Sequence, residues 1–260
     1  MNSAPLLEVN DLRKSFDGVV AVKSASFTVH SGEICSIVGP NGAGKTTAIN
    51  LITGVYKPDH GKILYDRKNL VGLQPNQVIS LGIARTFQNV RVFGNMTVLE
   101  NVMVGYHRLA TVSLLDVVLS LPKARIEERH IRAKSMAALE TVDLVSRAHE
   151  PSDLLPLGMQ KMLELARSLV SEPKLLLLDE PAAGLNDAET EALGHMLRRI
   201  RDQGITILLI EHNMPLVMGI SDRIVVLNYG EKIAEGTPRE VRMNPDVIAA
   251  YLGKQESADD

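Results

Sequence analysis

The chain has 260 residues, of which 45% are hydrophobic and 23% charged, and its formal net charge is −3. These values are ordinary for a globular protein that folds in water. The small negative charge gives no reason to expect a nucleic-acid-binding face. The longest apolar runs, such as Leu175 to Leu178 and Ile207 to Ile210, are far too short to span a bilayer. Any membrane role must therefore come through a partner protein.

The first residues favour a cytoplasmic protein, and the cysteine count limits its disulfide and metal chemistry. The N-terminus lacks the basic and then apolar pattern of a signal segment, which predicts that the protein stays in the cytoplasm. Cys35 is the only cysteine, so an internal disulfide and a cysteine-cluster metal site are excluded. We expect Cys35 to be a small buried core residue.

Two β-rich stretches open the chain, Leu6 to Phe16 and Ala25 to Val29, and Asp17-Gly18 is a turn signal after the first one. They predict an antiparallel β layer. Phe16 is one of only four phenylalanines, which draws attention to it. Its ring could stack on a nucleotide base or could fill the β layer, and the residues alone leave both interpretations open.

The next segment, residues 34–50, reads ICSIVGPNGAGKTTAIN and contains a phosphate-binding loop. Two glycines flank four residues and are followed by Lys and Thr, which is the pattern that cradles phosphates. The loop consists of Gly39, Pro40, Asn41, Gly42, Ala43, Gly44, Lys45 and Thr46. The apolar run before the loop predicts a buried strand, and Thr47 to Leu51 predicts a helix that stops at Gly54.

The residue types in this loop predict its chemistry. Glycines let backbone N–H groups surround a polyphosphate, and the helix that begins at Thr47 adds the positive end of its dipole. Lys45 can reach the β- and γ-phosphates, and the Thr46 hydroxyl can hold Mg²⁺. The segment therefore predicts a nucleoside triphosphate site that works with Mg²⁺.

Two further strands are predicted after the loop, Gly61 to Tyr65 and Leu81 to Phe87, and the second ends at Gln88. Gln88 could touch Mg²⁺ or the attacking water. Taken alone, a glutamine in such a place is more often a solvated loop residue.

The residues after Gln88 have the sequence pattern of helices. Thr97-Val98-Leu99-Glu100 is a capping box, which predicts the start of a helix. Leu114 to Leu121 is largely apolar, and Lys123 to Val142 is charged and helix-prone. About residues 89–170 are therefore predicted to form a helical subdomain inserted into the nucleotide-binding core.

Carboxylates follow a buried strand in the second half of the chain. A helix is predicted to begin near Gly158, because apolar residues recur at helical spacing after it. The strand Leu175 to Leu178 then delivers Asp179 and Glu180 to its carboxyl end. A phosphate-loop enzyme needs such a pair, since one carboxylate holds Mg²⁺ and the other polarises water.

A histidine follows the next predicted strand. An amphipathic helix from Leu193 to Ile200 is closed by Gly204, and Ile205 to Ile210 is a buried strand that ends just before His212. His212 could contact the γ-phosphate. A lone histidine at a strand end is usually structural, so its weight comes from the neighbouring carboxylates.

The C-terminal part predicts a hairpin, Arg223 to Leu227 with Glu231 to Ala234, and two short helices that start at Thr237-Pro238 and Asn244-Pro245. No internal repeat or flexible linker is present in the sequence. The chain is therefore predicted to be a single nucleotide-binding domain over residues 1–260, with C-terminal helices and a tail over about 237–260.

The chain resembles the ATP-binding subunits of ATP-binding cassette (ABC) transporters over nearly its whole length. It contains, in that family's order, the phosphate loop, Gln88, the pair Asp179 and Glu180, and His212. The resemblance implies the α/β fold of a P-loop NTPase (RecA-like) core with an antiparallel β subdomain and an inserted α-helical subdomain. It implies ATP and Mg²⁺ as cofactors and ATP hydrolysis as the activity.

The same resemblance implies a role for each of four residues. Phe16 would stack on adenine, and Gln88 would sense Mg²⁺ and the lytic water. Glu180 would be the catalytic base, and His212 would hold the γ-phosphate.

Three details narrow the resemblance. Ala182-Ala183-Gly184-Leu185-Asn186, Glu211-His212-Asn213-Met214 and Ala250-Tyr251-Leu252-Gly253 look like branched-chain amino-acid importers and their urea-type relatives. An importer of this kind implies transmembrane permease subunits as partners, a second ATPase subunit that is identical or different, and a solute-binding protein as an indirect partner. It also implies a peripheral position on the cytoplasmic face of the membrane.

One motif departs from the family pattern. The family signature normally reads Leu-Ser-Gly-Gly-Gln, whereas the matching stretch here is Leu155-Pro156-Leu157-Gly158-Met159. Only Leu155 and Gly158 fit, and the serine hydroxyl that contacts the opposite subunit's γ-phosphate is missing. Gly158 is the one residue of this stretch that we expect to approach a nucleotide, that of the partner subunit.

Three other functions remain open at this stage. The chain could serve an exporter, or it could be a cassette protein of repair or translation. It could also be a regulator that binds nucleotide with weak hydrolysis. Repair and translation cassettes commonly carry two phosphate loops, and this chain has one. The intact Glu180 and His212 argue against a regulator, and the altered signature argues for it.

Overall fold

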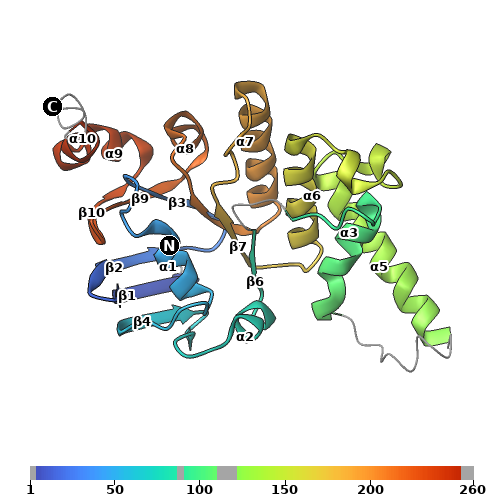
Figure 1. The fold of residues 1–260 in the computed structure, drawn as a ribbon, viewed down its shortest axis with the longest axis horizontal. Coiled ribbons are helices and arrows are strands. Elements are labelled where there is room, and N and C mark those ends of the chain that lie inside the picture. The colour runs from blue at the N-terminus through green and yellow to red at the C-terminus, as the bar shows by residue number, and fades with distance from the viewer. Residues whose placement is uncertain (1–3, 87–90, 110–121, 253–260) are drawn as a thin grey trace.

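The computed structural model describes residues 4–86, 91–109 and 122–252 (Figure 1). Its described strands form a ten-stranded sheet in the order β5-β4-β1-β2-β10-β9-β3-β8-β7-β6. The strands are β1 (Leu7–Phe16), β2 (Val19–Val29), β3 (Ile34–Val38), β4 (His60–Tyr65), β5 (Lys68–Asn69), β6 (Ile83–Arg85), β7 (Leu175–Asp179), β8 (Thr206–Ile210), β9 (Arg223–Asn228) and β10 (Glu231–Gly236). The α-helices are α1 (Lys45–Ile52), α2 (Pro75–Ser80), α3 (Val98–Gly105), α5 (Pro122–Thr141), α6 (Leu157–Leu169), α7 (Asp187–Asp202), α8 (Met214–Ile220), α9 (Pro238–Met243) and α10 (Pro245–Leu252). The short 3₁₀ helices are η1 (Tyr106–Leu109), η2 (Val145–Arg147) and η3 (Ser152–Leu154).

The core of the sheet is parallel. β3 pairs with β8 and β9, β7 pairs with β8 and β6, and all of these pairs run parallel. Every residue of β3, β7 and β8 is buried. Such continuous burial is expected of strands covered on both faces, and it explains their largely apolar sequences.

The two faces of the core strands pack into different clusters. Leu176 and Leu178 of β7 belong to the cluster that includes residues of α3, α5, α6 and α7. Leu175 and Leu177 belong to the cluster that includes α1 and the strands β1 and β2. Successive side chains of a strand point to opposite faces, so the four leucines pack the sheet against the layers on both of its faces.

The antiparallel layer is β1 with β2 and β4, as expected from the first residues of the chain. It continues the core sheet through a parallel bridge between Ser24 of β2 and Glu231 of β10. β10 in turn pairs antiparallel with β9, which confirms the predicted hairpin. Cys35 is buried in β3, also as expected.

The helices α3, α5 and α6 lie together on one side of the molecule, and α9 and α10 lie on the opposite side, against β9 and β10 (Figure 1). We refer to α3, α5 and α6 as the helical lobe. They pack against one another. In the described part of the chain, no helix has both the length and the apolar character of a membrane span.

Some predicted boundaries were wrong. The strand predicted from Leu81 to Phe87 is only Ile83–Arg85, because α2 ends at Ser80 and Gly82 turns the chain with a φ of 96°. The strand predicted from Ala25 begins at Val19, since Val19 and Val20 pair with the end of β1 although both are exposed. The predicted apolar stretch Leu114 to Leu121 lies outside the described residues.

Asn101 fastens the helical lobe to the segment that leads into it. The side chain is fully buried. Its Oδ1 accepts a hydrogen bond from the N–H of Phe93 at 2.8 Å, and its Nδ2 donates to the Thr97 carbonyl at 3.0 Å and to Ser152 Oγ at 3.1 Å. Thr97 also caps α3 in a capping box with Glu100, as the sequence predicted.

Replacing this buried amide should destabilise the protein more than removing the cap. We expect Asn101→Ala to lower the free energy of unfolding by at least about 2 kcal/mol, since each buried partner left without a hydrogen bond costs roughly 1–3 kcal/mol. Thr97→Ala is the matched control and should cost only about 1 kcal/mol. Urea denaturation followed by circular dichroism measures both. An equal loss in the two variants would contradict the role of Asn101.

Candidate nucleotide-binding and catalytic site

The register of three parallel strands brings the predicted site residues to one edge of the sheet. Ile37 of β3 pairs with Ile210 of β8, and Ile210 pairs with Asp179 of β7. The phosphate loop, Glu180 and His212 begin one or two residues beyond this row. Parallel strands end at the same edge, so segments far apart in the sequence meet there.

Two glycines of the phosphate loop are required by close contacts. Gly39 has a φ of 154°, and a Cβ there would lie 2.0 Å from the carbonyl oxygen of Leu227. Gly44 has a φ of 96°, and a Cβ there would lie 2.5 Å from the carbonyl oxygen of Ala21. The loop is therefore seated directly on the backbones of β9 and β2, and side chains at these two positions would displace it.

Lys45 lies inside the loop and is only 6% exposed. Its Nζ donates to the carbonyl oxygens of Gly39 at 2.8 Å and Pro40 at 3.0 Å. α1 starts at Lys45, two residues earlier than predicted, so Thr46 and Thr47 lie in its first turn.

The other loop residues differ in exposure. Asn41, Gly42 and Thr46 are exposed, Thr47 is half-buried and Ala43 is buried. The Thr46 side chain is thus accessible to a ligand at the N-terminus of α1, the positive end of the helix dipole.

Asp179 is almost completely buried and is held by an arginine that the sequence analysis gave no role. Arg85 Nη2 donates to Asp179 Oδ2 at 3.1 Å, and Arg85 Nη1 donates to Asn50 Oδ1 of α1 at 2.7 Å. Asp179 Oδ1 is buried and has no hydrogen-bond partner among the described residues. Burial raises the pKa of Asp179 above its ordinary value, and the Arg85 guanidinium opposes this shift. One carboxylate oxygen is therefore left for a ligand.

Glu180 and His212 face each other beside this carboxylate. His212 Nδ1 lies 3.8 Å from Glu180 Oε1, and the exposed fractions of the two side chains are 59% and 20%. Glu180 has a φ of 51°, in the left-handed region that few side chains other than glycine adopt. Its N–H donates to the carbonyl oxygen of Ile210 at 2.9 Å, so β8 holds it in place.

Phe16 lies at the end of β1 and is partly exposed. Its ring meets the ring of Tyr56 edge-on, with 5.0 Å between centroids, and Lys14 Nζ lies 5.2 Å from its centroid. It does not belong to the buried cluster of the β layer. Of the two interpretations left open, filling the interior of the β layer is therefore the weaker.

Two predicted residues remain, Gln88 and Gly158. Gln88 lies outside the described residues. Gly158 is in the first turn of α6, where a Cβ would lie 2.7 Å from Glu189 Oε1 of α7. Pro156 is the N-cap of α6 and makes no side-chain capping bond, as expected from its lack of a hydroxyl.

Sequence reasoning missed two further buried charges near the site, Lys161 and Glu211. Lys161 is 7% exposed and Glu211 is fully buried. The signal was available in both cases. Lys161 is in line with Leu165 and Leu169 on the apolar side of α6, and Glu211 directly follows five buried residues of β8. A charge in such a place needs a partner inside the protein.

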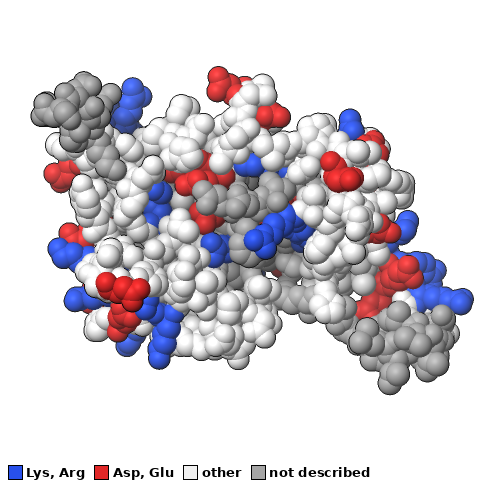
Figure 2. All heavy atoms as spheres, in the orientation of Figure 1, with Lys and Arg blue, Asp and Glu red and all other residues white. Residues whose placement is uncertain are grey.

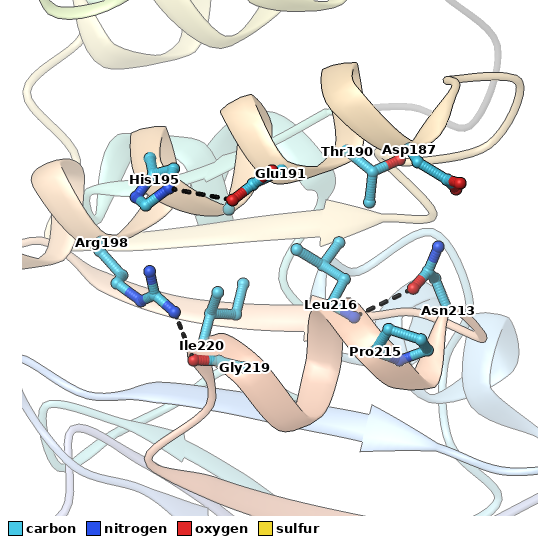
Figure 3. Close-up of a pocket in the computed structure, with 11 residues that line it drawn as sticks. Asp187, Thr190, Glu191, His195, Arg198, Asn213, Pro215, Leu216, Gly219 and Ile220 are labelled. Carbon is cyan, nitrogen blue, oxygen red and sulfur yellow. Dashed lines mark hydrogen bonds and ion pairs between the residues drawn. The ribbon is translucent and has the colours of Figure 1, made fainter.

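A groove of about 500 Å³ lies between α7 and α8 (Figure 3). Figure 3 shows Arg198 donating to the carbonyl of Gly219, at 2.5 Å, and His195 beside Glu191. The lining residues come from α7, α8 and Asn213, and none belongs to the phosphate loop. The nucleotide site predicted from the loop is therefore a different place.

Charged side chains of both signs are interspersed on the face shown in Figure 2. Acidic and basic groups also lie side by side near the middle of that face, between the sheet and the helical lobe (Figure 2). Such a distribution produces no extended field of one sign on this face.

The chain matches two known families. Residues 22–183 match the family described as ABC transporter. Residues 231–257 match the family described as branched-chain amino acid ATP-binding cassette transporter.

Individual relatives are similar over almost the full length. The high-affinity branched-chain amino acid transport ATP-binding protein LivG of Salmonella typhimurium is 46% identical, over 97% of this chain and 99% of LivG. The corresponding protein BraF of Pseudomonas aeruginosa is 44% identical over the same shares. A crystal structure of an ATP-binding cassette of an ABC transporter in its ADP conformation superposes with a TM-score of 0.84 and 31% identity, over 96% of this chain and all of the other.

The matched residues 22–183 contain the phosphate loop and the carboxylate pair, and the solved relative has the same fold. The predicted P-loop NTPase fold is thus confirmed. The chain belongs to the ABC transporter family.

Proposed function

We propose that this chain is the ATP-hydrolysing subunit that energises an importer of branched-chain or other hydrophobic amino acids. The proposal rests chiefly on one observation, the sheet edge at which Lys45, Asp179, Glu180 and His212 meet. The substrate class comes from LivG and BraF, whose names state branched-chain amino acid transport. The match of residues 231–257 supports the same class.

ATP binding begins at the phosphate loop. Lys45 Nζ, which donates to the carbonyls of Gly39 and Pro40, would turn its charge to the β- and γ-phosphates. The N–H groups at the start of α1 would surround the phosphate oxygens, and the ring of Phe16 would stack on adenine.

The residues at the sheet edge fit Mg²⁺, which takes hard oxygen ligands. The buried Asp179 Oδ1 without a hydrogen-bond partner is such a ligand, and Thr46 and Gln88 would supply further oxygens. When bound, the ion neutralises charge on the β- and γ-phosphate oxygens. Arg85 keeps Asp179 Oδ2 occupied, which orients the carboxylate toward that place.

Glu180 would accept the proton of the attacking water, and His212 would hold the γ-phosphate from the neighbouring strand. Their 3.8 Å separation lets one imidazole nitrogen contact the carboxylate while the other faces the phosphate. General base catalysis of this kind contributes typically about 10²- to 10⁴-fold to a rate.

The chain would act as one domain, with the helical lobe as an inserted subdomain. Two such subunits would close around ATP and reopen after hydrolysis, and this motion would drive transmembrane permease subunits. The chain would therefore lie on the cytoplasmic face of the membrane, and a solute-binding protein would deliver the amino acid from outside.

The altered signature supports a partner that differs from this chain. Pro156 has neither a hydroxyl nor a backbone N–H, so it cannot donate to a phosphate. Any composite site that uses this chain's α6 would depend on Gly158 and the helix N-terminus alone. The partner would then be an ATPase subunit with a complete signature, and this chain's phosphate loop would form the stronger of two unequal sites.

Lys45→Ala should weaken ATP binding at least about tenfold, because a hydrogen bond to a charged group contributes roughly 1.5–3 kcal/mol. Isothermal calorimetry measures the dissociation constant. Lys62→Ala, at an exposed position of β4, is the control and should bind ATP like the parent. Near-normal binding by Lys45→Ala would refute the phosphate-loop assignment.

Glu180→Gln should bind ATP normally and lower the hydrolysis rate at least about a hundredfold, because the amide keeps the shape and loses the base. Glu191→Gln, at an exposed position of α7, should hydrolyse ATP at the parental rate. In cells that lack the chain, the parent should restore uptake of labelled leucine and Glu180→Gln should not. Restored uptake of urea instead would overturn the amino-acid assignment.

Restoring the signature with Pro156→Ser and Leu157→Gly should raise the ATPase rate of the purified chain about tenfold or more, the equivalent of one charge-assisted hydrogen bond. The rate is measured by phosphate release over a range of protein concentrations. If the double variant is no faster, and the parent alone is already a cooperative ATPase, the two sites are not unequal.

A further inference from the structure

The buried side chains of Lys161 and Glu211 bind the turn of residues 181–183, which follows the carboxylates Asp179 and Glu180. Lys161 Nζ donates to the carbonyl oxygens of Pro181 at 2.7 Å and Ala183 at 2.5 Å. Between these carbonyls, the N–H of Ala182 donates to Glu211 Oε1 at 2.7 Å. One cation and one anion thus hold two peptide groups of the turn, 181–182 at both its carbonyl oxygen and its N–H, and 183–184 at its carbonyl oxygen.

The same glutamate holds the histidine segment. Glu211 Oε2 accepts hydrogen bonds from the N–H groups of His212 at 3.0 Å and Asn213 at 3.2 Å. Asn213 in turn caps α8, where its Oδ1 accepts from the N–H of Leu216. The two oxygens of one carboxylate therefore tie the turn 181–183 to the backbone that carries His212.

The turn also determines the backbone of the proposed base. Glu180 has the left-handed φ of 51°, which persists only where surrounding contacts impose it. The N–H of Glu180 donates to the Ile210 carbonyl at 2.9 Å. The carbonyl of Glu180 accepts a hydrogen bond from the N–H of Ala183 at 3.1 Å. Since Lys161 holds Ala183, a shift of the turn would shift Glu180.

Lys161 reaches this turn from the helical lobe. It lies in the second turn of α6, the helix that begins directly after Pro156 of the altered signature. α6 packs against α3 and α5, whereas Glu211 follows a strand of the core sheet (Figure 1). The pair Lys161 and Glu211 thus bridges the lobe and the sheet at the catalytic edge.

Stability alone gives a poor account of these two charges. Burial lowers the pKa of Lys161, against the opposing effect of the nearby carboxylates, Glu211 first among them. Apolar side chains of similar volume are often as stabilising as buried charges. Lys161 and Glu211, in contrast, form hydrogen bonds to particular backbone atoms beside Glu180 and His212, which apolar side chains cannot do.

We propose that Lys161 and Glu211 are positioning residues for ATP hydrolysis, which together align Glu180 and His212. Because Lys161 belongs to α6, a movement of α6 would change this alignment. A partner that contacts the signature end of α6 would thereby act on this chain's own base. The inference rests on the proposed function, in which Glu180 is that base.

The test compares single-turnover hydrolysis with ATP affinity in the purified full chain. We expect Lys161→Met to lower the rate constant roughly 10- to 100-fold, as a misplacement of a catalytic group by about 1 Å does. The dissociation constant for ATP should stay within about twofold of the parent, because the change affects the transition state. Lys161→Arg, which can donate to both carbonyls, should restore most of the rate.

Lys134→Met is the matched control, since Lys134 pairs with Glu172 on the surface of α5 and is 43% exposed. It should hydrolyse ATP like the parent. Glu211→Gln should also slow hydrolysis, because its single carbonyl oxygen cannot serve both the turn and the His212 segment. The double variant of Lys161→Met and Glu211→Gln should lose less than the product of the two separate losses, because both residues hold one turn.

Parental rates in Lys161→Met and Glu211→Gln would overturn the proposal. The proposal would also be overturned if these variants lost as much ATP affinity as rate, and if Lys161→Arg did not restore either constant. If Lys161→Met fails to fold, Lys161→Arg and Glu211→Gln decide the question by the same two constants. Failure of the proposed function is seen separately, as unchanged hydrolysis in Glu180→Gln.

Discussion

The parallel register of β3, β8 and β7 is the constraint on which the rest of the structure depends. Ile37, Ile210 and Asp179 occupy one row across the three strands. Each strand is buried along its length and largely apolar, so the charged residues of these segments lie where the strands end. Because the strands end together, the lysine of one segment, the carboxylates of the second and the histidine of the third share a single edge.

The charges at this edge are stabilised from inside the protein. Arg85 occupies one oxygen of Asp179 and ties that carboxylate to α1, and Glu211 and Lys161 saturate the backbone on the other side of Glu180. A hydrogen bond in such a dry place is stronger than in water, and a missing one costs more. These contacts therefore restrain the backbone of the site, and Asp179 Oδ1 is left as a buried oxygen without a hydrogen-bond partner among the described residues.

The N-terminal part of α6 carries two positions with different proposed roles. Its N-terminus offers a proline where a hydroxyl donor is usual for the family, and one turn later it offers a lysine whose contacts are complete. Under the proposals above, a subunit built in this way would contribute little to the nucleotide of its partner, and its own base would respond to the position of that partner. The groove between α7 and α8 adds nothing to this picture, since its lining is remote from the loop in the sequence and internally paired.

The sequence by itself determined the chemistry of the site and most of the elements that carry it. Apolar runs that end in polar residues marked β7 and β8, the glycines and Lys45 marked the phosphate loop, and Thr97 marked α3, because these signals are local. Boundaries that depend on pairing were less accessible. Val19 and Val20 became strand only because β1 lies beside them.

Tertiary structure alone decided which residues meet. The helical spacing of Lys161 with Leu165 and Leu169 indicates that it is buried, but nothing local identifies its partners, which are carbonyls twenty or more residues away, at Pro181 and Ala183. Glu211 and Arg85 are the same case, since a buried charge is explained only by the groups that surround it. The sequence indicated the groups that we propose to react, and the packing of α6 and β8 around one turn determined how they are held.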